Sequence, residues 1–497
     1  MTSDRMESRL GRITKKIDMK KQLLLSIAMV VFMGAAIAQR AEQKYYPVTD
    51  PLVKENLEKW EDVKFGLLMH WGPYSQWGVV ESWSICSEDV GWARRKSDNY
   101  VEYKKEYENL QTTFNPKKFD PEKWAKAAAG AGMKYMVFTT KHHDGFCMFD
   151  SKYTDYKITD PKTPFHKNSK ANVTKELFNA FRAEGMMVGA YFSKPDWHCE
   201  DYWWPNFATP DRNVNYDVTK YPDRWENYVQ FTHNQIMELM TDYGDVDILW
   251  LDGGWVQKMT PEKVKEYNCK EGYQFTNVQS QDIRMDELAA KAREKQPGLI
   301  VVDRAVVGPN QNYLTPENTV PKEMLPYPWE SCIIMGGGWS YSFNAKFKSD
   351  RELIHMLVDI VSKGGNLLLN IGPSPEGTWY DAAYERLEAM GEWMDINSEA
   401  IYETRKIAPY RDGQVCFTEN KDKKAIYAIY LLNENQSLPE TLKVILPEIP
   451  ANAKMTILGS GSKVKYSKVG DAYELEIPNR IISKPPSDKA VVIKIEK

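Results

Sequence analysis

Apolar and polar positions follow two alternating patterns along the chain from about residue 50 to residue 400. Short, almost continuous apolar runs alternate with segments whose apolar residues recur every three or four positions, the period of a helix with one buried face. Leu353, Leu357 and Val361 recur in this way. Such alternation predicts a parallel sheet covered by helices. About seven strands in one stretch favour a (β/α)8-like TIM barrel over an open doubly wound sheet.

The pattern predicts the bounds of the barrel elements. The expected strands are Phe65–Met69, Tyr135–Thr140, Met187–Phe192, Val246–Leu251, Leu299–Val302, Cys332–Met335 and Leu367–Ile371. The expected helices are Pro121–Ala131, Val173–Glu184, Asp223–Tyr243, Met285–Lys295 and Asp350–Lys363.

The pattern changes near residue 400, where short strand-like runs separated by turns replace the alternation. Many short strands of this kind are typical of a small antiparallel sandwich. We therefore expect a barrel domain over residues 39–400 and a C-terminal antiparallel β-sandwich over residues 401–497. The expected sandwich strands are Val415–Thr418, Ala425–Leu432, Leu442–Leu446, Met455–Leu458, Ala472–Ile477 and Ala490–Ile495.

The first residues have the pattern of an export signal. Two lysines precede an apolar run over residues 23–38, which ends in the small-x-small cleavage site Ala36-Ile37-Ala38. We expect residues 19–38 to be a signal peptide and residues 1–18 to be an upstream or non-native extension. The mature chain is expected to begin near Gln39, in the periplasm or outside the cell. The apolar run is too short and too poorly flanked for a membrane span.

The composition argues against several classes of function. The formal net charge is −4 and the basic residues are dispersed, so no nucleic-acid partner is expected. Nucleotide-binding GxGxxG and serine-hydrolase GxSxG patterns are missing. The oligomeric state is left open. Six scattered cysteines without CxxC spacing are expected to be mostly free, buried thiols: Cys86, Cys147, Cys199, Cys269, Cys332 and Cys416.

Polar residues stand where several predicted strands end. His70 follows the first strand, the His142-His143 pair the second, and Arg304 the fifth, while the fourth strand ends at Asp252. In a parallel barrel the C-terminal ends of the strands meet at one face, where ligands bind. Asp252 is the first candidate for chemistry, because a carboxylate at the end of a buried strand is costly unless partners hold it.

Each of these residues also has a structural interpretation. His70 could be a core histidine with a local partner, and His142-His143 could form a turn held by Asp144. Arg304 could form a structural ion pair with Asp303. Three histidines near acids could also bind zinc, but adjacent histidines point in different directions and no HExxH spacing is present. No metal is expected.

Two further carboxylates, Glu317 and Glu330, follow the fifth strand. Alone, each could be an exposed loop residue. Carboxylates on different strand ends, together with neutral imidazoles and aromatic walls, describe a sugar-binding pocket. Hydrolysis of a glycosidic bond uses two acids, one that attacks the anomeric carbon or activates water and one that protonates the leaving oxygen. The set therefore predicts a glycoside hydrolase.

Several motifs occur in one order along the chain, and on these the chain resembles the α-L-fucosidases of glycoside hydrolase family 29. The resemblance covers roughly residues 55–405. The segments Lys141–Phe146 (KHHDGF) and Val361–Pro373 (VSKGGNLLLNIGP) are its most specific parts. The remaining motifs are Lys64–Gly72, Gly132–Tyr135, Ser151–Asp155, Trp250–Gly253, Asp303-Arg304 and Trp329-Glu330.

The resemblance implies a barrel followed by a β-sandwich, with a retaining double-displacement mechanism that uses no cofactor. It implies that Asp252 is the nucleophile, that Arg304 lies beside it, and that three residues bind the fucose hydroxyls: His70, His142 and His143. It further implies pocket positions for Tyr191, Trp250 and Trp339, the last near the C5 methyl group of the sugar. Glu81 and Trp83 resemble a Glu-Trp pair that contacts fucose, although a serine separates them here.

The acid/base residue is not fixed by the resemblance. Glu317 lies in the variable loop after Arg304, where several members place it, and is favoured. Glu330, in a more recognisable Trp-Glu motif, is the rival. The acid of a retaining enzyme is expected about 5–5.5 Å from Asp252, with a pKa raised enough to hold its proton at neutral pH.

The sequence therefore predicts an exported, retaining exo-α-L-fucosidase that acts on terminal α-L-fucosyl residues of oligosaccharides or glycoconjugates. Two alternatives stay open. The same chemistry could act on α-L-galactosides, which differ by a hydroxyl group at C6, near Trp339. The chain could also be a catalytically inactive fucose-binding protein. The linkage and the aglycone that it prefers are not readable from the sequence.

Overall fold

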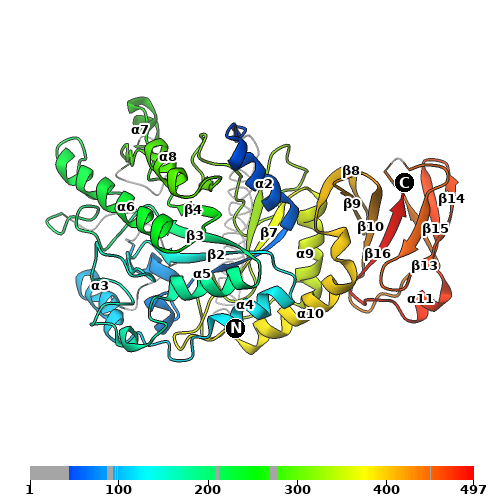
Figure 1. Ribbon diagram of the computed structural model, residues 1–497, viewed down its shortest axis with the longest axis horizontal. Coiled ribbons are helices and arrows are strands. Elements are labelled where there is room, and N and C mark those ends of the chain that lie inside the picture. The colour runs from blue at the N-terminus through cyan, green and yellow to red at the C-terminus, as the bar shows by residue number, and fades with distance from the viewer. Residues whose placement is uncertain are drawn as a thin grey trace, which may run out of the picture. The chain divides into compact units, whose positions relative to one another are not determined.

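Seven parallel strands form a curled, TIM-like sheet in the order β5-β4-β3-β2-β1-β7-β6 (Figure 1). The computed structural model describes residues 44–497 except 87–92, 94, 96, 98, 208–211, 269–277 and 448. The predicted signal peptide and Cys269 therefore lie outside the described residues. The strands are β1 (Phe65–Met69), β2 (Tyr135–Lys141), β3 (Met187–Ser193), β4 (Ile248–Asp252), β5 (Ile300–Asp303), β6 (Glu330–Ile334) and β7 (Asn366–Ile371).

The predicted barrel is confirmed, but it is irregular where β5 and β6 would meet. No hydrogen-bonded ladder joins these two strands in the described sheet. Instead, residues 311–318 run between them: Leu314 bridges Trp329, and Glu317 bridges Cys332. The amide of Glu330 donates to the carbonyl of Leu314 at 2.8 Å. This irregular segment carries Glu317 along the edge of β6.

Helices cover the sheet, and the five predicted ones are present within one or two residues. Five helices begin after a residue whose side chain accepts a hydrogen bond from their first amides. These N-cap residues are Asp50 before α2, Asn99 before α3, Asp120 before α4, Asn172 before α5 and Ser349 before α9. Ser349 and Glu352 form a reciprocal capping box. The helices are α2 (Pro51–Val63), α3 (Tyr100–Glu108), α4 (Pro121–Gly130), α5 (Val173–Ala183), α6 (Pro222–Asp242), α7 (Pro261–Asn268), α8 (Met285–Lys295), α9 (Asp350–Ser362) and α10 (Asp381–Asn397). No helix in the described ranges is long and apolar enough to cross a membrane.

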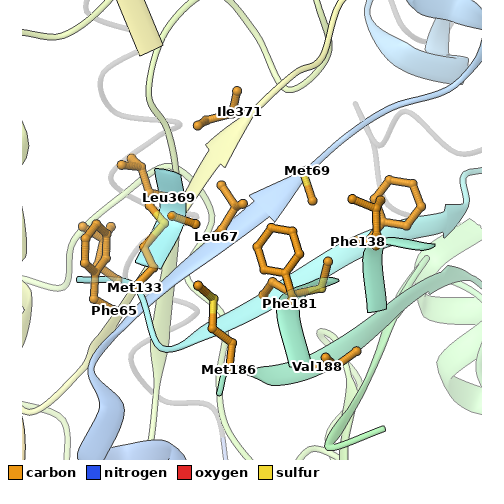
Figure 2. Close-up of a cluster of buried hydrophobic side chains, with 14 of the residues drawn as sticks. Phe65, Leu67, Met69, Met133, Phe138, Phe181, Met186, Val188, Leu369 and Ile371 are labelled. Atoms are coloured by element: carbon orange, nitrogen blue, oxygen red, sulfur yellow. The ribbon is translucent and has the colours of Figure 1, made fainter. Parts of the chain in front are cut away.

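Both faces of the parallel sheet are buried, which explains why its strands are almost wholly apolar. On β1, Leu67 and Met69 join the cluster beneath the helices, with Phe138, Phe181 and other residues shown in Figure 2. Leu68, one position along, joins the barrel interior instead. A side chain at Gly66 would collide with the ring of Tyr135 at 2.4 Å, so this glycine makes room for an aromatic ring inside the barrel.

The C-terminal region forms two antiparallel sheets over a shared core, as predicted. Alternate residues of β10 face different partners: Tyr427 and Ile429 pack into the main core with the barrel helices, and Ile426 and Ala428 face the second sheet. The strands are β8 (Thr404–Asp412), β9 (Val415–Asn420), β10 (Ala425–Leu431), β11 (Thr441–Val444), β12 (Lys454–Ile457), β13 (Ser462–Lys463), β14 (Lys465–Val469), β15 (Ala472–Glu476) and β16 (Ala490–Glu496), with a short helix α11 (Asn479–Ser483).

Direct bonds join the larger C-terminal sheet to the barrel helices. The indole nitrogen of Trp393 donates to the carbonyl of Ala490 at 3.0 Å, and the guanidinium group of Arg351 donates to the carbonyl of Leu432 at 2.7 Å. Because its central strands β9, β10 and β16 are buried on both faces, this sheet buttresses the barrel.

Candidate active site

The carboxyl ends of the parallel strands gather the predicted polar residues at one edge of the sheet. Asp252 is the last residue of β4, and Arg304 directly follows β5. His70 directly follows β1, and His142 directly follows β2. Tyr191 lies within β3, paired with Trp250 of β4 in the strand register.

Asp252 accepts hydrogen bonds from two polar side chains and lies near a third. Arg304 Nη1 donates to its Oδ1 at 2.9 Å, and the hydroxyl of Tyr191 donates to its Oδ2 at 2.8 Å. His143 Nε2 lies 3.7 Å from the same Oδ2. Burial alone raises the pKa of Asp252, but Arg304 and then His143 outweigh it, and the pKa lies well below its ordinary value. Asp252 is therefore an ionised, oriented carboxylate.

Arg304 holds a second carboxylate. Its Nη2 contacts Oε2 of Glu317, while Nη1 binds Asp252. The plane of the guanidinium group packs over the ring of Trp250, with the central carbon 5.3 Å from the ring centroid. The side chain of Glu317 is 39% exposed, against 16% for Asp252. One cation thus brings together a buried acid and a more accessible acid. The alternative pairing of Arg304 with Asp303 is wrong, because Asp303 binds Lys194.

The sequence predicted that Glu330 lies at the carboxyl end of a strand, and this prediction is wrong. Glu330 is the first residue of β6 and lies at its amino end. It is fully buried, and it accepts hydrogen bonds from the hydroxyl of Tyr135 at 2.7 Å and from the indole nitrogen of Trp250 at 3.2 Å. Burial raises its pKa to about 7. The Trp250 ring binds Glu330 at its edge and Arg304 on its face. Glu330 therefore lies beneath the site, within the barrel.

The three histidines are buried and close together. The ring centroids of His142 and His143 are 4.2 Å apart, and those of His70 and His142 are 5.7 Å apart. Burial lowers the pKa of His70 and of His143 to about 4 and that of His142 well below its ordinary value. All three are neutral at neutral pH. Neutral imidazoles suit hydrogen bonds to uncharged hydroxyl groups.

Aromatic rings and Glu81 border the histidines. Trp339 lies 5.3 Å from His70, and Trp83 lies 5.1 Å from His143, measured between ring centroids. Glu81 has a positive φ of 38°, which is costly for a residue other than glycine. Its carboxyl group accepts from the amide of Ser340 at 2.7 Å, and burial raises its pKa to about 8. Glu81 thus ties the segment of Trp83 to the segment of Trp339.

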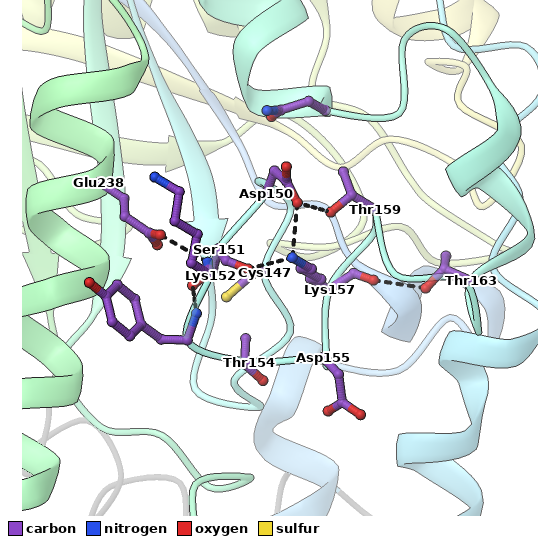
Figure 3. Close-up of polar contacts among 12 residues, drawn as sticks. Cys147, Asp150, Ser151, Lys152, Thr154, Asp155, Lys157, Thr159, Thr163 and Glu238 are labelled. Carbon is purple, nitrogen blue, oxygen red and sulfur yellow. Dashed lines mark hydrogen bonds and ion pairs between the residues drawn. The ribbon is translucent and has the colours of Figure 1, made fainter.

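The motif Ser151–Asp155 stabilises the loop after the histidine pair (Figure 3). Within the motif, the amide of Tyr153 donates to the hydroxyl of Ser151 at 3.2 Å, and just outside it Thr159 and Lys157 both donate to Asp150, at 2.6 and 2.9 Å. The amide of Lys152 donates to Glu238 of α6 at 2.8 Å. These contacts bind the loop to itself and to α6, which explains the motif without a role in substrate binding.

Three residues at the site are not among the predicted site residues. Asn370 contacts His70 and lies in the specific Val361–Pro373 segment, so its motif was a signal. Trp255 packs 5.3 Å from His143 and follows the two glycines after Asp252, another signal. Ser82 contacts His142, and nothing in the sequence marked it.

His142, His143 and Asp252 place donor atoms within 4.8 Å of one another, a spacing that a metal ion could bridge. A dication there would lie beside the guanidinium group that already binds Asp252. It would also find Nδ1 of His142 engaged with Ser82 at 2.6 Å. The donor set is therefore a poor fit, and the absence of a metal stays a prediction.

A parallel barrel that gathers two carboxylates, neutral imidazoles and aromatic walls at its C-terminal edge defines a glycoside hydrolase. A sequence model described as Alpha-L-fucosidase matches residues 32–399. The chain belongs to the α-L-fucosidase family, glycoside hydrolase family 29.

Known α-L-fucosidases are similar to this chain over most of its length. The human plasma alpha-L-fucosidase is 29% identical over 410 residues, covering 78% of this chain and 79% of the relative. The alpha-fucosidase of Thermotoga maritima in complex with fucose is 28% identical, with a TM-score of 0.68 and coverage of 91% of this chain and 100% of that one. Alpha-L-fucosidase isoenzyme 1 from Paenibacillus thiaminolyticus is 27% identical, with a TM-score of 0.69 and coverage of 90% and 99%.

The buried Glu330 generates a prediction about stability. Because its pKa is about 7 in the folded protein against 4.5 ordinarily, the folded protein holds a proton that the unfolded chain releases. The contribution of this proton to the stability of the folded protein is fully present below pH 4.5 and is lost as the pH rises through about 7. The Glu330→Gln variant should therefore gain stability relative to wild type as the pH rises from about 5 to about 8, in urea unfolding experiments.

The exposed Glu392→Gln provides the control, and its stability should follow that of wild type at every pH. A difference between Glu330→Gln and wild type that stays constant with pH would contradict the protonation of Glu330.

Proposed function

We propose that this chain is a retaining exo-α-L-fucosidase, which hydrolyses terminal α-L-fucosyl residues by double displacement. The observation that carries the proposal is the single guanidinium group of Arg304, which binds both Asp252 and Glu317. A mechanism through a covalent sugar ester needs one ionised nucleophile and one acid that can exchange protons with solvent. A solved Thermotoga maritima alpha-fucosidase, 28% identical, carries a mechanism-based inhibitor.

In the first step, an oxygen of Asp252 attacks the anomeric carbon as the bond from that carbon to the leaving oxygen breaks. Glu317 gives its proton to the leaving oxygen, so that the aglycone departs as an alcohol. Asp252 is suited to attack because Arg304 and Tyr191 keep it ionised and oriented. Glu317 is suited to proton transfer because it is the more exposed of the two acids.

In the second step, Glu317 removes a proton from water, and the resulting hydroxide attacks the anomeric carbon. The ester bond breaks, and Asp252 regains its charge. Two inversions at one carbon give net retention. Arg304 faces one ionised carboxylate at each stage, first Asp252 and then Glu317, so its charge stays compensated throughout.

The remaining side chains suit a single terminal sugar. Neutral His70, His142 and His143 offer hydrogen bonds without the cost of burying a charge. Trp339 and Trp83 supply apolar walls beside them. Glu330 supports Trp250 from below and takes no part in proton transfer to the substrate.

Replacement of the nucleophile tests the mechanism. The Asp252→Gly variant should fold but lose nearly all hydrolysis of an aryl α-L-fucoside, because no ester can form. Added azide should restore turnover and yield a fucosyl azide, since the small anion fills the vacated space. Near-normal hydrolysis by Asp252→Gly, measured by release of the aryl alcohol, would rule out Asp252.

The loss of activity on removal of the acid should depend on the leaving group of the substrate. The Glu317→Ala variant should lose far more activity on a fucosyl disaccharide than on an aryl fucoside whose leaving group needs no proton. The ratio of kcat/KM on the two substrates measures this effect. The Glu330→Gln variant serves as the matched control and should keep the wild-type ratio. The opposite result, with only the Glu330 variant sensitive to the leaving group, would move the acid role to Glu330.

We further propose that the enzyme is exported after cleavage near Ala38. The support is the basic and apolar pattern of residues 19–38 and the Ala36-Ile37-Ala38 site. N-terminal sequencing of the protein from a secreting host should begin near Gln39. A cytoplasmic product that retains residues 19–38 would contradict export.

A further inference from the structure

Two of the three histidines contact polar neighbours that can decide where each imidazole carries its proton. Asn370, near the end of β7, is fully buried. Its side chain lies between Nδ1 of His70, at 2.8 Å, and the carbonyl oxygen of Trp339, at 2.7 Å. A carbonyl oxygen only accepts hydrogen bonds, so the amide nitrogen of Asn370 must face Trp339.

This orientation fixes the tautomer of His70. The amide oxygen of Asn370 then faces His70, and because that oxygen only accepts, Nδ1 of His70 must carry the hydrogen. A neutral imidazole has one ring hydrogen. His70 therefore presents an unprotonated Nε2, which accepts hydrogen bonds. Within the described residues, this Nε2 makes no hydrogen bond to the protein.

Ser82 assigns the opposite tautomer to His142. The hydroxyl oxygen of Ser82 accepts from the amide of Asp144 at 2.8 Å and lies 2.6 Å from Nδ1 of His142. Of the two partners that the Ser82 hydroxyl oxygen has among the described residues, the Asp144 amide only donates, so that nitrogen is the partner that can accept the hydroxyl hydrogen. Nδ1 of His142 therefore accepts, and the ring hydrogen lies on Nε2, which becomes a donor.

We infer that Asn370 and Ser82 are positioning residues that set complementary tautomers, so that His70 accepts a hydrogen bond from a sugar hydroxyl group and His142 donates one. The inference rests on the proposed function only for the identity of the sugar, since the tautomers belong to the free protein. The ring centroids are 5.7 Å apart, which is close enough for both rings to contact one sugar. A hydroxyl group can satisfy either ring, whereas an ether oxygen cannot donate to His70 and an ammonium group cannot accept from His142.

Asn370 has a second consequence. The same amide that sets His70 also binds the backbone of Trp339, whose next residue, Ser340, donates to Glu81. The tautomer of His70 and the position of the Trp339 wall are therefore set by one side chain. A change at Asn370 should affect recognition of the sugar more than the chemical step.

Nuclear magnetic resonance of the free enzyme, labelled with ¹⁵N in its histidines, tests the inference without substrate. The chain has seven histidines, and the signals of His70 and His142 are assigned from variants that lack each ring. The expected spectrum shows hydrogen on Nδ1 of His70 and on Nε2 of His142. Hydrogen on Nε2 of His70 or on Nδ1 of His142 would overturn the inference. Failure to hydrolyse any fucoside would instead defeat the proposed function and leave this result intact.

The Asn370→Asp variant tests the link to activity. Aspartate still accepts from His70 but adds a negative charge and removes the donor to Trp339. The charged and titratable groups around His70 are Asp252, Glu317, Arg304, His142, His143 and Tyr191, and none of them changes. The new charge should raise the pKa of His70 and move the acidic limb of the kcat/KM profile to higher pH. We expect kcat/KM to fall about 10- to 100-fold, mostly through KM, because a buried polar group loses its partner.

Asn366→Asp is the matched control for the aspartate variant. Asn366 is buried on the same strand, but it donates to the carbonyl of Trp60 at 2.6 Å and lies at the far end of β7. Its variant should lose stability without shifting the acidic limb. An unshifted limb in Asn370→Asp, or an equal shift in both variants, would overturn the role of Asn370.

The Ser82→Ala variant tests the other half. Without the hydroxyl group, His142 loses the donor that selects its tautomer, and its ¹⁵N signals should move toward a mixture of the two forms. Ser84→Ala, two residues along the same buried segment, should leave the His142 signals unchanged. Unchanged His142 signals in Ser82→Ala would show that the serine does not set the tautomer.

Discussion

The site depends on one guanidinium group, that of Arg304, which contacts two acids, Asp252 and Glu317. A buried carboxylate at the end of an apolar strand is costly, and this guanidinium group is the largest of the contributions that stabilise ionised Asp252. The same group holds Glu317 at its other nitrogen. Because Arg304 packs on the ring of Trp250, its plane is fixed, and so are the positions of both acids.

The barrel determines where this ion pair forms. Parallel strands bring Asp252 and Arg304 to one edge of the sheet because β4 and β5 are neighbours. The gap between β5 and β6 then lets an irregular segment carry Glu317 back toward Arg304. Beneath them, Trp250 rests on Tyr191, with ring centroids 5.2 Å apart, and binds Glu330. Trp250, Tyr191 and Glu330 thus pack beneath the site and support its residues from inside the barrel.

Much of this arrangement could be predicted from the sequence, because burial on both faces leaves a strong apolar signal in each barrel strand. Asp252 stood out for the same reason. Three C-terminal strands were missed. The residues of β8 and β14 are mostly exposed or half-buried, and β13 has only two residues, so none of them leaves an apolar pattern. The gap between β5 and β6 left no signal, since the strands on either side look ordinary.

The positions of Glu317 and Glu330 relative to Asp252 could not be predicted from the sequence. Glu330 lies in the more recognisable motif, but a motif does not reveal which end of a strand a residue occupies, and β6 begins at this glutamate. Glu317 lies in an irregular segment without periodicity, so its contact with Arg304 depends on the folded barrel. The roles of Asn370 and Ser82 depend on contacts across 300 and 60 residues of sequence, which no local pattern records.

The most direct test is to trap the covalent intermediate with a 2-deoxy-2-fluoro fucosyl fluoride and to locate the added mass by peptide mass spectrometry. An ester on the peptide that contains Asp252, and on that residue, is the predicted result. The same sugar attached to Glu317 or to another carboxylate, or steady turnover of the reagent with no covalent adduct, would contradict the account.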